Sequence, residues 1–268
     1  MPEGHTLHRL ANDLNAAFAD HVVAVSSPQG RFVEGAALVD GQLWHGAQAH
    51  GKHLFCAFAG EMWVHIHLGL IGSLRFGPPG PPVGQVRLRL ATDDVVADLR
   101  GPQFCALITD DERRLLESRL GPDPLDPAAD PEPARRRISR SSRSIGALLM
   151  DQTVLAGVGN VYRAEVLFRQ RINPETPGRK LKPSSWRAIW ADLVDLMPYG
   201  VADNRIDTVR PEHTPEEMGR PPRVDDHGGE VYVYRRDQQP CHVCGAMIRT
   251  KIVEGRNLFW CGRCQRRS

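Results

Sequence analysis

The chain has 268 residues, 41% hydrophobic and 25% charged, fractions typical of a soluble globular protein. It contains no run of 18 apolar residues and does not open with a basic segment followed by an apolar one. The sequence therefore predicts neither a membrane span nor a secretory signal, and we expect a cytoplasmic protein. The net charge is only +2, but arginine and lysine cluster over residues 135–143 and 249–267. Such clusters indicate a polyanionic partner, although solvated surfaces would look the same in composition.

The first predicted elements are a helix and a series of short strands. Apolar residues recur every three or four positions from Leu7 to Phe18, which predicts an amphipathic helix. From Val22 the period changes to two, as in HLFCAF, MWVHIHL and VRLRL, and clusters such as FGPPGPPVG separate these stretches. The pattern predicts a β-sandwich or barrel. We assign residues 1–118 to an N-terminal β-sandwich domain that begins with a helix.

The next stretch is rich in proline, and helical patterns follow it. GPDPLDPAADPEPARR has five prolines in sixteen residues, so we expect an interdomain linker over residues 119–134. SIGALLMDQ, NVYRAEVLFRQ and SSWRAIWADLVDLM predict helices within a domain over residues 135–229. Residues 201–226 show no clear pattern and are expected to form a loop. VYVYRR predicts a short strand that enters a cysteine-rich module over residues 230–268. The fold class is α+β multidomain.

Four of the six cysteines have the spacing of a metal site. Two CxxC pairs are separated by sixteen residues, which fits one tetrahedral zinc ion bound by four thiolates. Such a site leaves no open position for water, so the metal is expected to be structural. The ligands are Cys241, Cys244, Cys261 and Cys264. The other two, Cys56 and Cys105, lie in strand-like stretches and are expected to be small core residues.

Two further stretches contain candidate contact residues. In DQTVLAGVGNVYRAEVLF, Gly157 and Gly159 interrupt a helix and Asn160 suits the start of the next one, where free backbone amides can bind a phosphate. A plain turn between helices would have the same appearance. HGKHLF places Lys52 before a strand, in a region dense in histidines. These histidines are better explained as phosphate contacts or satisfied polar groups than as metal ligands.

Taken in order, these motifs resemble one family. PEG behind Met1, GK before a strand, HLGLIGSLR, LMDQTVLAGVGNVYRAEVLF and GRNLFWCGRCQ occur as in the formamidopyrimidine-DNA glycosylase and endonuclease VIII family of base-excision repair. The resemblance covers essentially the whole chain. It implies a catalytic sandwich, a helix–two-turn–helix domain and a zinc finger. It also implies a monomeric, nucleoid-associated enzyme whose partner is damaged DNA, double- or single-stranded, with one structural Zn²⁺ as cofactor.

The resemblance also implies roles for single residues. Pro2 matches the amine that attacks C1′ of the damaged nucleotide, provided that Met1 is removed. An α-amino group has a pKa of about 7.7–8.0, against about 10.4 for lysine, so more of it is the neutral nucleophile near neutral pH. Glu3 matches the acid that protonates the sugar-ring oxygen, and Lys52 matches the proton donor of the elimination. Two residues match phosphate contacts: Asn160 in the two-turn motif and Arg256 in the finger.

Two loops distinguish the branches of this family. Leu70 in HLGLIGSLR matches the wedge that fills the space of an extruded base. In DLRGPQFC only Arg100 remains of the double arginine that the 8-oxoguanine enzymes have in this loop. His5 and Thr6 also replace the proline and glutamate of many relatives. We therefore expect the endonuclease VIII branch, of actinobacterial type, which removes oxidised pyrimidines and then cleaves the strand by β- or β,δ-elimination.

Three other functions are compatible with parts of this pattern. An 8-oxoguanine or formamidopyrimidine glycosylase of the same family would share most of the motifs. A non-catalytic zinc-finger protein would bind DNA without using Pro2 or Glu3. A zinc-dependent hydrolase is disfavoured, because the four-cysteine site is closed to water.

Overall fold

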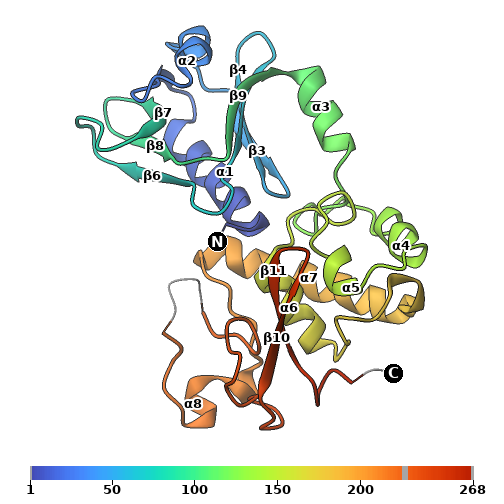
Figure 1. Ribbon diagram of the computed structural model, residues 1–268. Coiled ribbons are helices and arrows are strands. Elements are labelled where there is room, and N and C mark those ends of the chain that lie inside the picture. Colours follow the sequence, from blue (N-terminus) through green and yellow to red (C-terminus); the bar gives the residue numbers. More distant parts are fainter. Residues whose placement is uncertain (1, 225–228, 267–268) are drawn as a thin grey trace. The chain divides into compact units, whose positions relative to one another are not determined.

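The computed structural model describes residues 2–224 and 229–266. The chain forms two compact units, Met1–Arg119 and Leu120–Ser268 (Figure 1). Each unit has its own hydrophobic core. Among the described helices, none combines the length and the apolar composition that crossing a bilayer requires.

The first unit contains two antiparallel sheets and a long N-terminal helix, as the sequence predicts. One sheet has the strand order β2-β1-β7-β8-β6 and the other the order β3-β4-β5-β9. The strands of the first sheet are β1 (Val22–Ser26), β2 (Gln42–Leu43), β6 (Ser73–Gly77), β7 (Val86–Ala91) and β8 (Val96–Arg100). Those of the second are β3 (Gly46–His50), β4 (His53–Phe58), β5 (Met62–His67) and β9 (Phe104–Thr109). The helices are α1 (Gly4–Phe18), α2 (Val33–Val39) and α3 (Asp110–Ser118).

Helix α1 packs in one core with both sheets. The helix buries the four apolar side chains whose spacing predicted it, Leu7, Leu10, Leu14 and Phe18. A polar contact fixes it to the edge strand β3. The Asn15 side-chain nitrogen donates to the Ala47 carbonyl oxygen at 2.9 Å, and the Asn15 side-chain oxygen accepts from the Ala47 amide at 2.6 Å. This double contact fixes α1 relative to the β3–β4 hairpin.

The second unit combines helices with one β-hairpin. Its α-helices are α4 (Glu132–Ser139), α5 (Ile145–Leu148), α6 (Asn160–Arg169), α7 (Pro183–Asp203) and α8 (Pro215–Met218). Two short 3₁₀ turns are η1 (Gly178–Lys180) and η2 (Pro211–His213), and the hairpin is formed by β10 (Ile248–Val253) and β11 (Arg256–Cys261). Figure 1 shows the hairpin as one twisted ribbon. Its residues Ile248 and Phe259 are buried in the same core as α6 and α7.

The proline-rich stretch differs from the expected linker. Helix α4 begins at Glu132, so regular structure starts within residues 119–134. The preceding residues pack against the turn before α6, because the Gly121 amide donates to the Gln152 carbonyl oxygen and the Ala156 amide donates to that of Pro122. The prolines prevent regular structure before Glu132. Backbone groups of this stretch nevertheless form hydrogen bonds with the turn before α6.

The prediction of a strand at VYVYRR is wrong, because residues 231–236 form turns. The amides of Tyr232, Val233 and Tyr234 all donate to the carboxylate of Glu165, at 2.7 to 2.8 Å, and the Thr208 hydroxyl donates to it at 2.6 Å. A strand directs successive amides to opposite sides, so three consecutive amides that converge on one group require a turn. Glu165 is fully buried on α6. This carboxylate therefore ties the segment before the cysteines to α6.

Residues 201–226 are more regular than expected. Helix α7 continues to Asp203, with Pro198 within it, and η2 and α8 follow. The last two residues of that stretch lie outside the described residues. One face of α7 is apolar and faces the core, with Trp186, Ile189, Leu193 and Met197 buried and Trp190 half-buried. The domain limits 135–229 and 230–268 stay a prediction.

Candidate active site and nucleic-acid interface

The N-terminal residues Pro2 and Glu3 lie at the start of α1. Pro2 is half-buried, while the side chain of Glu3 is fully buried. Glu3 is the N-cap of the helix and forms a capping box with Thr6, whose hydroxyl accepts from the Glu3 amide at 3.4 Å. The N-terminus of a helix carries a partial positive charge, which favours a carboxylate there. The fold thus fixes an acidic side chain directly beside the residue predicted to act as nucleophile.

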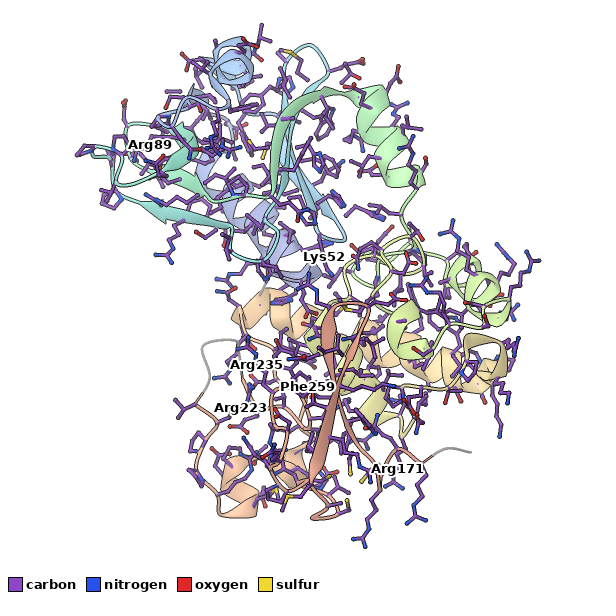
Figure 2. The ribbon with its side chains drawn as sticks, viewed as in Figure 1. Lys52, Arg89, Arg171, Arg223, Arg235 and Phe259 are labelled. Atoms are coloured by element: carbon purple, nitrogen blue, oxygen red, sulfur yellow. The ribbon has the colours of Figure 1, made fainter. Side chains whose placement is uncertain are left out.

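Lys52 lies in the turn between β3 and β4, where His50 pairs with His53 (Figure 2). The lysine side chain is half-buried. Because Asn15 fixes α1 to β3, the first turn of α1 and the hairpin that carries Lys52 belong to one rigid part of the first unit.

Three histidines follow Lys52 on the same sheet. His53 Nδ1 lies 2.8 Å from His65 Nε2, and the ring of His67 lies 5.1 Å from that of His53. Desolvation, followed by the neighbouring histidines, lowers the pKa of His53 to about 3, and desolvation lowers that of His65 to about 4. The pKa of His67 is lowered as well, by desolvation and then by Lys52. These rings are therefore neutral at physiological pH.

The predicted wedge lies in a loop that contacts the β8–β9 loop. The Gln103 amide donates to the Leu68 carbonyl oxygen at 3.3 Å, which joins the two loops. Leu70 is 54% exposed and its neighbour Ile71 is 86% exposed. Phe104, the first residue of β9, is also exposed, and its ring lies 4.9 Å from that of His65. The loop with Leu70 and the start of β9 both present apolar side chains to solvent.

Arg100 forms contacts within the sheet instead of extending from this loop. Its guanidinium donates to Asp98 at 2.8 Å and to the Val83 carbonyl oxygen at 3.1 Å. Asp98 also accepts two hydrogen bonds from Arg89, which is labelled in Figure 2. The hydrogen bond from Arg89, and then the charges of Arg89 and Arg100, hold the pKa of Asp98 below its usual range against the effect of burial. Sequence reasoning had no signal for this pairing.

Asn160 is buried in the second unit, at the first position of α6. The N-cap is Gly159, so the expectation that Asn160 caps the helix is wrong by one residue. The Asn160 side chain instead donates to the Asn257 carbonyl oxygen of the hairpin at 2.9 Å. Arg163, which is buried, donates to the same carbonyl oxygen at 3.3 Å and to the Asn160 side chain. The two-turn motif and the hairpin are thus joined directly.

Arg256 follows the tip of that hairpin. The tip is a two-residue turn, Glu254–Gly255, in which both residues have positive φ, as a type I′ turn requires. Two ion pairs fix the hairpin from its sides. Arg143 donates two hydrogen bonds to Glu254, at 2.8 and 3.1 Å, and Lys251 pairs with Glu175. Arg256 therefore lies on a hairpin with little freedom to move relative to α6.

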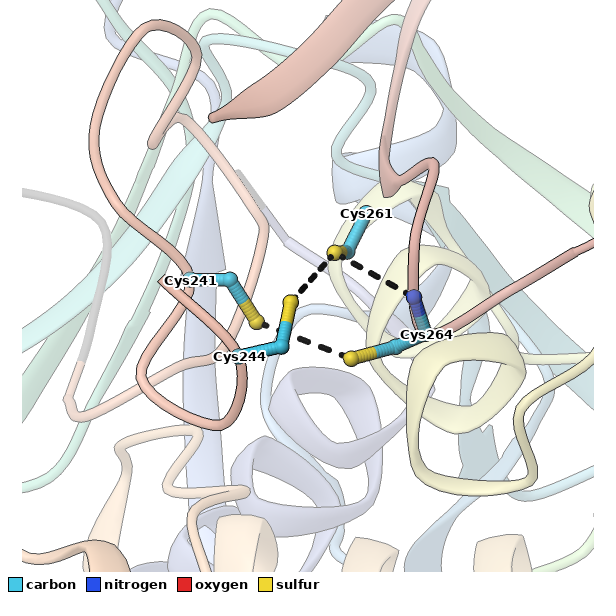
Figure 3. Close-up of side chains that lie close together, drawn as sticks. All are labelled: Cys241, Cys244, Cys261 and Cys264. Atoms are coloured by element: carbon cyan, nitrogen blue, oxygen red, sulfur yellow. Dashed lines mark hydrogen bonds between the residues drawn. The ribbon is translucent and has the colours of Figure 1, made fainter. Parts of the chain in front are cut away.

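The four predicted ligand cysteines come together at the other end of the hairpin (Figure 3). Their sulfur atoms all lie within 4.8 Å of one another, with Cys241 Sγ 3.9 Å from Cys264 Sγ and Cys244 Sγ 3.5 Å from Cys261 Sγ. Four thiolates at about 2.3 Å from one tetrahedral zinc ion would lie about 3.8 Å apart. The sulfur set therefore fits Zn²⁺.

Comparison with known proteins matches three stretches of the chain to family models. Residues 1–115 match the formamidopyrimidine-DNA glycosylase N-terminal domain, and residues 120–210 match the H2TH domain of the same enzyme. Residues 238–267 match the zinc finger found in FPG and IleRS. The chain belongs to the formamidopyrimidine-DNA glycosylase and endonuclease VIII family.

Relatives place it in the endonuclease VIII branch of this family. It is 50% identical over 271 residues to endonuclease 8 1 of Mycobacterium tuberculosis, covering 99% of this chain and 100% of the relative. It is 32% identical over 278 residues to probable endonuclease 8 2 of Streptomyces coelicolor, covering 99% and 94%. Members of the family are DNA glycosylases that also cleave at abasic sites, and the chain is accordingly a DNA-repair glycosylase.

Solved structures of the family share the fold. Fpg of Lactococcus lactis, in a complex with DNA that contains an abasic site, matches with a TM-score of 0.80 at 21% identity and covers 99% of this chain and 100% of its own. The same enzyme with DNA containing an oxidised pyrimidine matches equally well. At this identity the match concerns the fold alone.

Sequence reasoning missed several residues that position the predicted DNA-contact residues of the second unit. Arg143, Arg163 and Glu165 hold the two-turn motif, the hairpin and the segment before the cysteines together. An arginine or a glutamate within a helical pattern gives no signal of a partner about 70 to 110 residues away. Ile71 could have been found, since it is the neighbour of the predicted wedge in an exposed loop.

Proposed function

We propose that this glycosylase excises oxidised pyrimidines from damaged DNA through an imine formed by Pro2, and then cleaves the strand. The observation that supports this most directly is the start of α1, where a half-buried proline precedes a fully buried glutamate. A free proline amine is a secondary amine with a pKa near neutrality, so it can act as a nucleophile without a separate base. This requires removal of Met1, since an acylated nitrogen cannot attack.

In the proposed reaction, the Pro2 nitrogen forms a bond to C1′, the bond between C1′ and the base breaks, and the N–H proton of Pro2 leaves with the base. Glu3 donates a proton to the sugar-ring oxygen, so that the ring opens and an iminium ion forms at C1′. The iminium is a cation and draws electrons from C2′. Loss of a proton from C2′ then expels the 3′ phosphate by β-elimination, and Lys52 acts in proton transfer during this step. A second elimination at the 5′ side gives the β,δ product.

The remaining predicted residues hold the DNA. Arg256 at the hairpin tip binds phosphates near the lesion, and Asn160 orients the start of α6, whose backbone amides suit a phosphate. Leu70, with Ile71 beside it, enters the space of the extruded base. Arg100 takes no part in this proposal, because its guanidinium is held by Asp98.

One zinc ion bound by the four cysteines has a structural role. When bound, it supplies a cross-link between the two CxxC turns that sets the base of the hairpin. Cys241, Cys244, Cys261 and Cys264 use all four tetrahedral positions, so no water can be activated there. We propose further that the protein acts as a monomer in the cytoplasm, associated with the nucleoid.

The substrate preference follows from the branch and from the β8–β9 loop. With Arg100 paired in the sheet, recognition of the orphan base opposite the lesion is weak. We therefore propose thymine glycol and dihydrouracil as substrates, with activity in single-stranded and bubble DNA as well as in duplexes.

Reductive trapping tests the proposal. The purified protein is mixed with oligonucleotides that carry thymine glycol, dihydrouracil, a hydantoin, 8-oxoguanine or an abasic site, in single and double strands, with borohydride present. We expect a covalent adduct on Pro2 by peptide mass spectrometry and the fastest excision for the oxidised pyrimidines. Absence of an adduct indicates a non-catalytic DNA-binding protein. A preference for 8-oxoguanine opposite cytosine assigns the purine-lesion activity instead, and an active protein that retains Met1 contradicts the amine mechanism.

A further inference from the structure

Three exposed arginines surround a groove at the cysteine end of the hairpin. Arg249 lies on β10, while Arg263 and Arg266 follow β11, and all three side chains are exposed. They line a groove of about 630 Å³, together with Met247 and the turn around Cys244. Within the described part of the chain none of the three forms an ion pair, and the groove lining contains no acidic residue. The groove thus concentrates positive charge that no carboxylate neutralises.

The groove is built on a fixed scaffold. A methyl group at Gly262 would lie 2.7 Å from Cζ and 2.8 Å from Nε of Arg249, so the guanidinium lies directly against the glycine backbone. Arg263 donates to the Cys244 carbonyl oxygen at 3.2 Å. Both contacts are to the cysteine turns, which Zn²⁺ holds together when bound. Two of the three guanidinium groups are therefore positioned before any ligand arrives.

The groove is separate from the hairpin tip. Arg249 pairs with Trp260, whereas Arg256 pairs with Val253, so four residues of β11 separate the two positions. At about 3.3 Å per residue they lie about 13 Å apart along the hairpin. A DNA strand carries one phosphate for about every 3.4 Å of helix axis, so this distance corresponds to about four base pairs.

We propose that this groove is a second phosphate-binding surface, which holds the DNA backbone on one side of the lesion, about four base pairs beyond the phosphates bound at Arg256. The proposal rests on the proposed function, in which Arg256 contacts DNA. A planar guanidinium group can donate two parallel hydrogen bonds to two oxygens of one phosphate. A basic groove without acidic residues also favours a polyanion. Because the groove and the tip belong to one hairpin, DNA is the partner that reaches both.

Binding measurements on the full-length, zinc-loaded protein test this surface. The probe is a duplex with a central tetrahydrofuran abasic analogue and long flanks, with two further series in which the left or the right flank is shortened stepwise. We expect the wild-type affinity to fall when the flank on one side of the lesion, but not the other, becomes too short to reach the groove. The variant Arg249→Gln, Arg263→Gln, Arg266→Gln should not respond to that shortening. Its dependence of log K on log salt should be shallower by about 2 to 3, because each phosphate that the protein neutralises contributes about 0.9 to this slope.

Three single variants separate the groove from general charge effects. Arg31→Gln removes an exposed arginine of the first unit and should leave both the slope and the flank response unchanged, whereas Arg249→Gln should lower the slope by about 0.9. Gly262→Ala keeps the charge but displaces the Arg249 guanidinium, so it should weaken binding to the long duplex only. Zinc content is measured for every variant.

The outcomes are distinct from those of the proposed function. Borohydride trapping on a short duplex with a natural abasic site in place of the tetrahydrofuran analogue reports the Pro2 chemistry, and it should be equal for the wild type and the triple variant. If trapping succeeds while the triple variant keeps the wild-type salt slope and flank response, the groove does not bind DNA and the inference is wrong. The inference is then wrong even if the groove binds another polyanion, such as an acidic protein. Failure of trapping in the wild type contradicts the proposed function instead.

Discussion

Arg143 and Glu254 form a two-pronged ion pair between residues 111 positions apart in the chain. Arg143 lies just before α5 and Glu254 lies in the turn that precedes Arg256. Arg143 also donates to Asp151 at 2.7 Å, so a single guanidinium joins the two-turn motif to the hairpin tip. We expect Arg143→Gln to weaken binding to abasic-analogue DNA about fivefold, which corresponds to about 1 kcal/mol. DNA affinity is measured by fluorescence anisotropy for both single variants and the double variant, in a double-mutant cycle with Glu254→Gln.

The cycle separates positioning from direct contact. If Arg143 acts by holding Glu254, its replacement should matter less in the Glu254→Gln background, giving a measurable coupling energy. Additive effects of the two substitutions would show instead that Arg143 acts independently of the hairpin tip.

Glu165→Gln should destabilise the second unit strongly. The fully buried carboxylate accepts hydrogen bonds from three consecutive amides and from the Thr208 hydroxyl, whereas an amide side chain offers only one acceptor oxygen. We expect a loss of about 3 kcal/mol in the free energy of unfolding, measured by urea denaturation. The control Glu34→Gln, at an exposed position of α2, should change it by less than about 0.5 kcal/mol. Equal effects would mean that the buried carboxylate has no special role.

The histidine pair makes the first unit sensitive to acid. The pKa is about 3 for His53 and about 4 for His65 in the folded protein, below the ordinary value of 6.5. As the pH falls below about 6.5, the unfolded chain takes up protons that the folded chain does not, so stability decreases. We expect a loss on the order of 2 kcal/mol for each of the two histidines between pH 7.5 and pH 5.

Substitution identifies the groups responsible. The double variant His53→Gln, His65→Gln should lose a large part of this pH dependence in urea denaturation followed by tryptophan fluorescence; buried His5, whose pKa is also lowered to about 4, accounts for part of the rest. The variant His45→Gln, at an exposed position, should keep it. A double variant with an unchanged pH profile would locate the acid sensitivity elsewhere.

Cys244→Ser should abolish stoichiometric zinc binding, because only three of the four converging sulfur ligands remain. Since the cysteine segment shares its core with α6 and α7, we expect the loss of zinc to lower the thermal midpoint and to reduce DNA affinity at least tenfold. Metal analysis and calorimetry check both effects. Cys56→Ser, in the core of the first unit, serves as a comparison that should retain the metal.

Glu3→Gln should separate the two activities. Base excision needs a proton at the sugar ring, so it should fall by about 10² to 10⁴, whereas cleavage at a preformed abasic site should fall much less. Excision and cleavage are followed on matched oligonucleotides by gel electrophoresis. Normal excision of thymine glycol by this variant would remove Glu3 from the mechanism.

The sequence predicted those features that depend on local pattern. The spacing from Leu7 to Phe18, the alternation in β4 and β5 and the two CxxC pairs each specify an element without knowledge of distant partners. The strand predicted at residues 231–236 was wrong because the Glu165 carboxylate, more than sixty residues away, overrides the local β propensity. The contact between Arg100 and Asp98 escaped prediction for a similar reason, since sequence cannot say which partner an arginine will choose.

The anchoring of the C-terminal segment to α6 limits how this enzyme can be recombined. Glu165 supplies the acceptor for residues 232–234, and Asn160 and Arg163 contact the backbone of Asn257. The C-terminal segment contributes only backbone groups to these contacts, whereas α6 contributes the side chains. A chimera that exchanged the last forty or so residues would therefore keep the contacts only if α6 retained Glu165, Asn160 and Arg163 and the new segment followed the same backbone path.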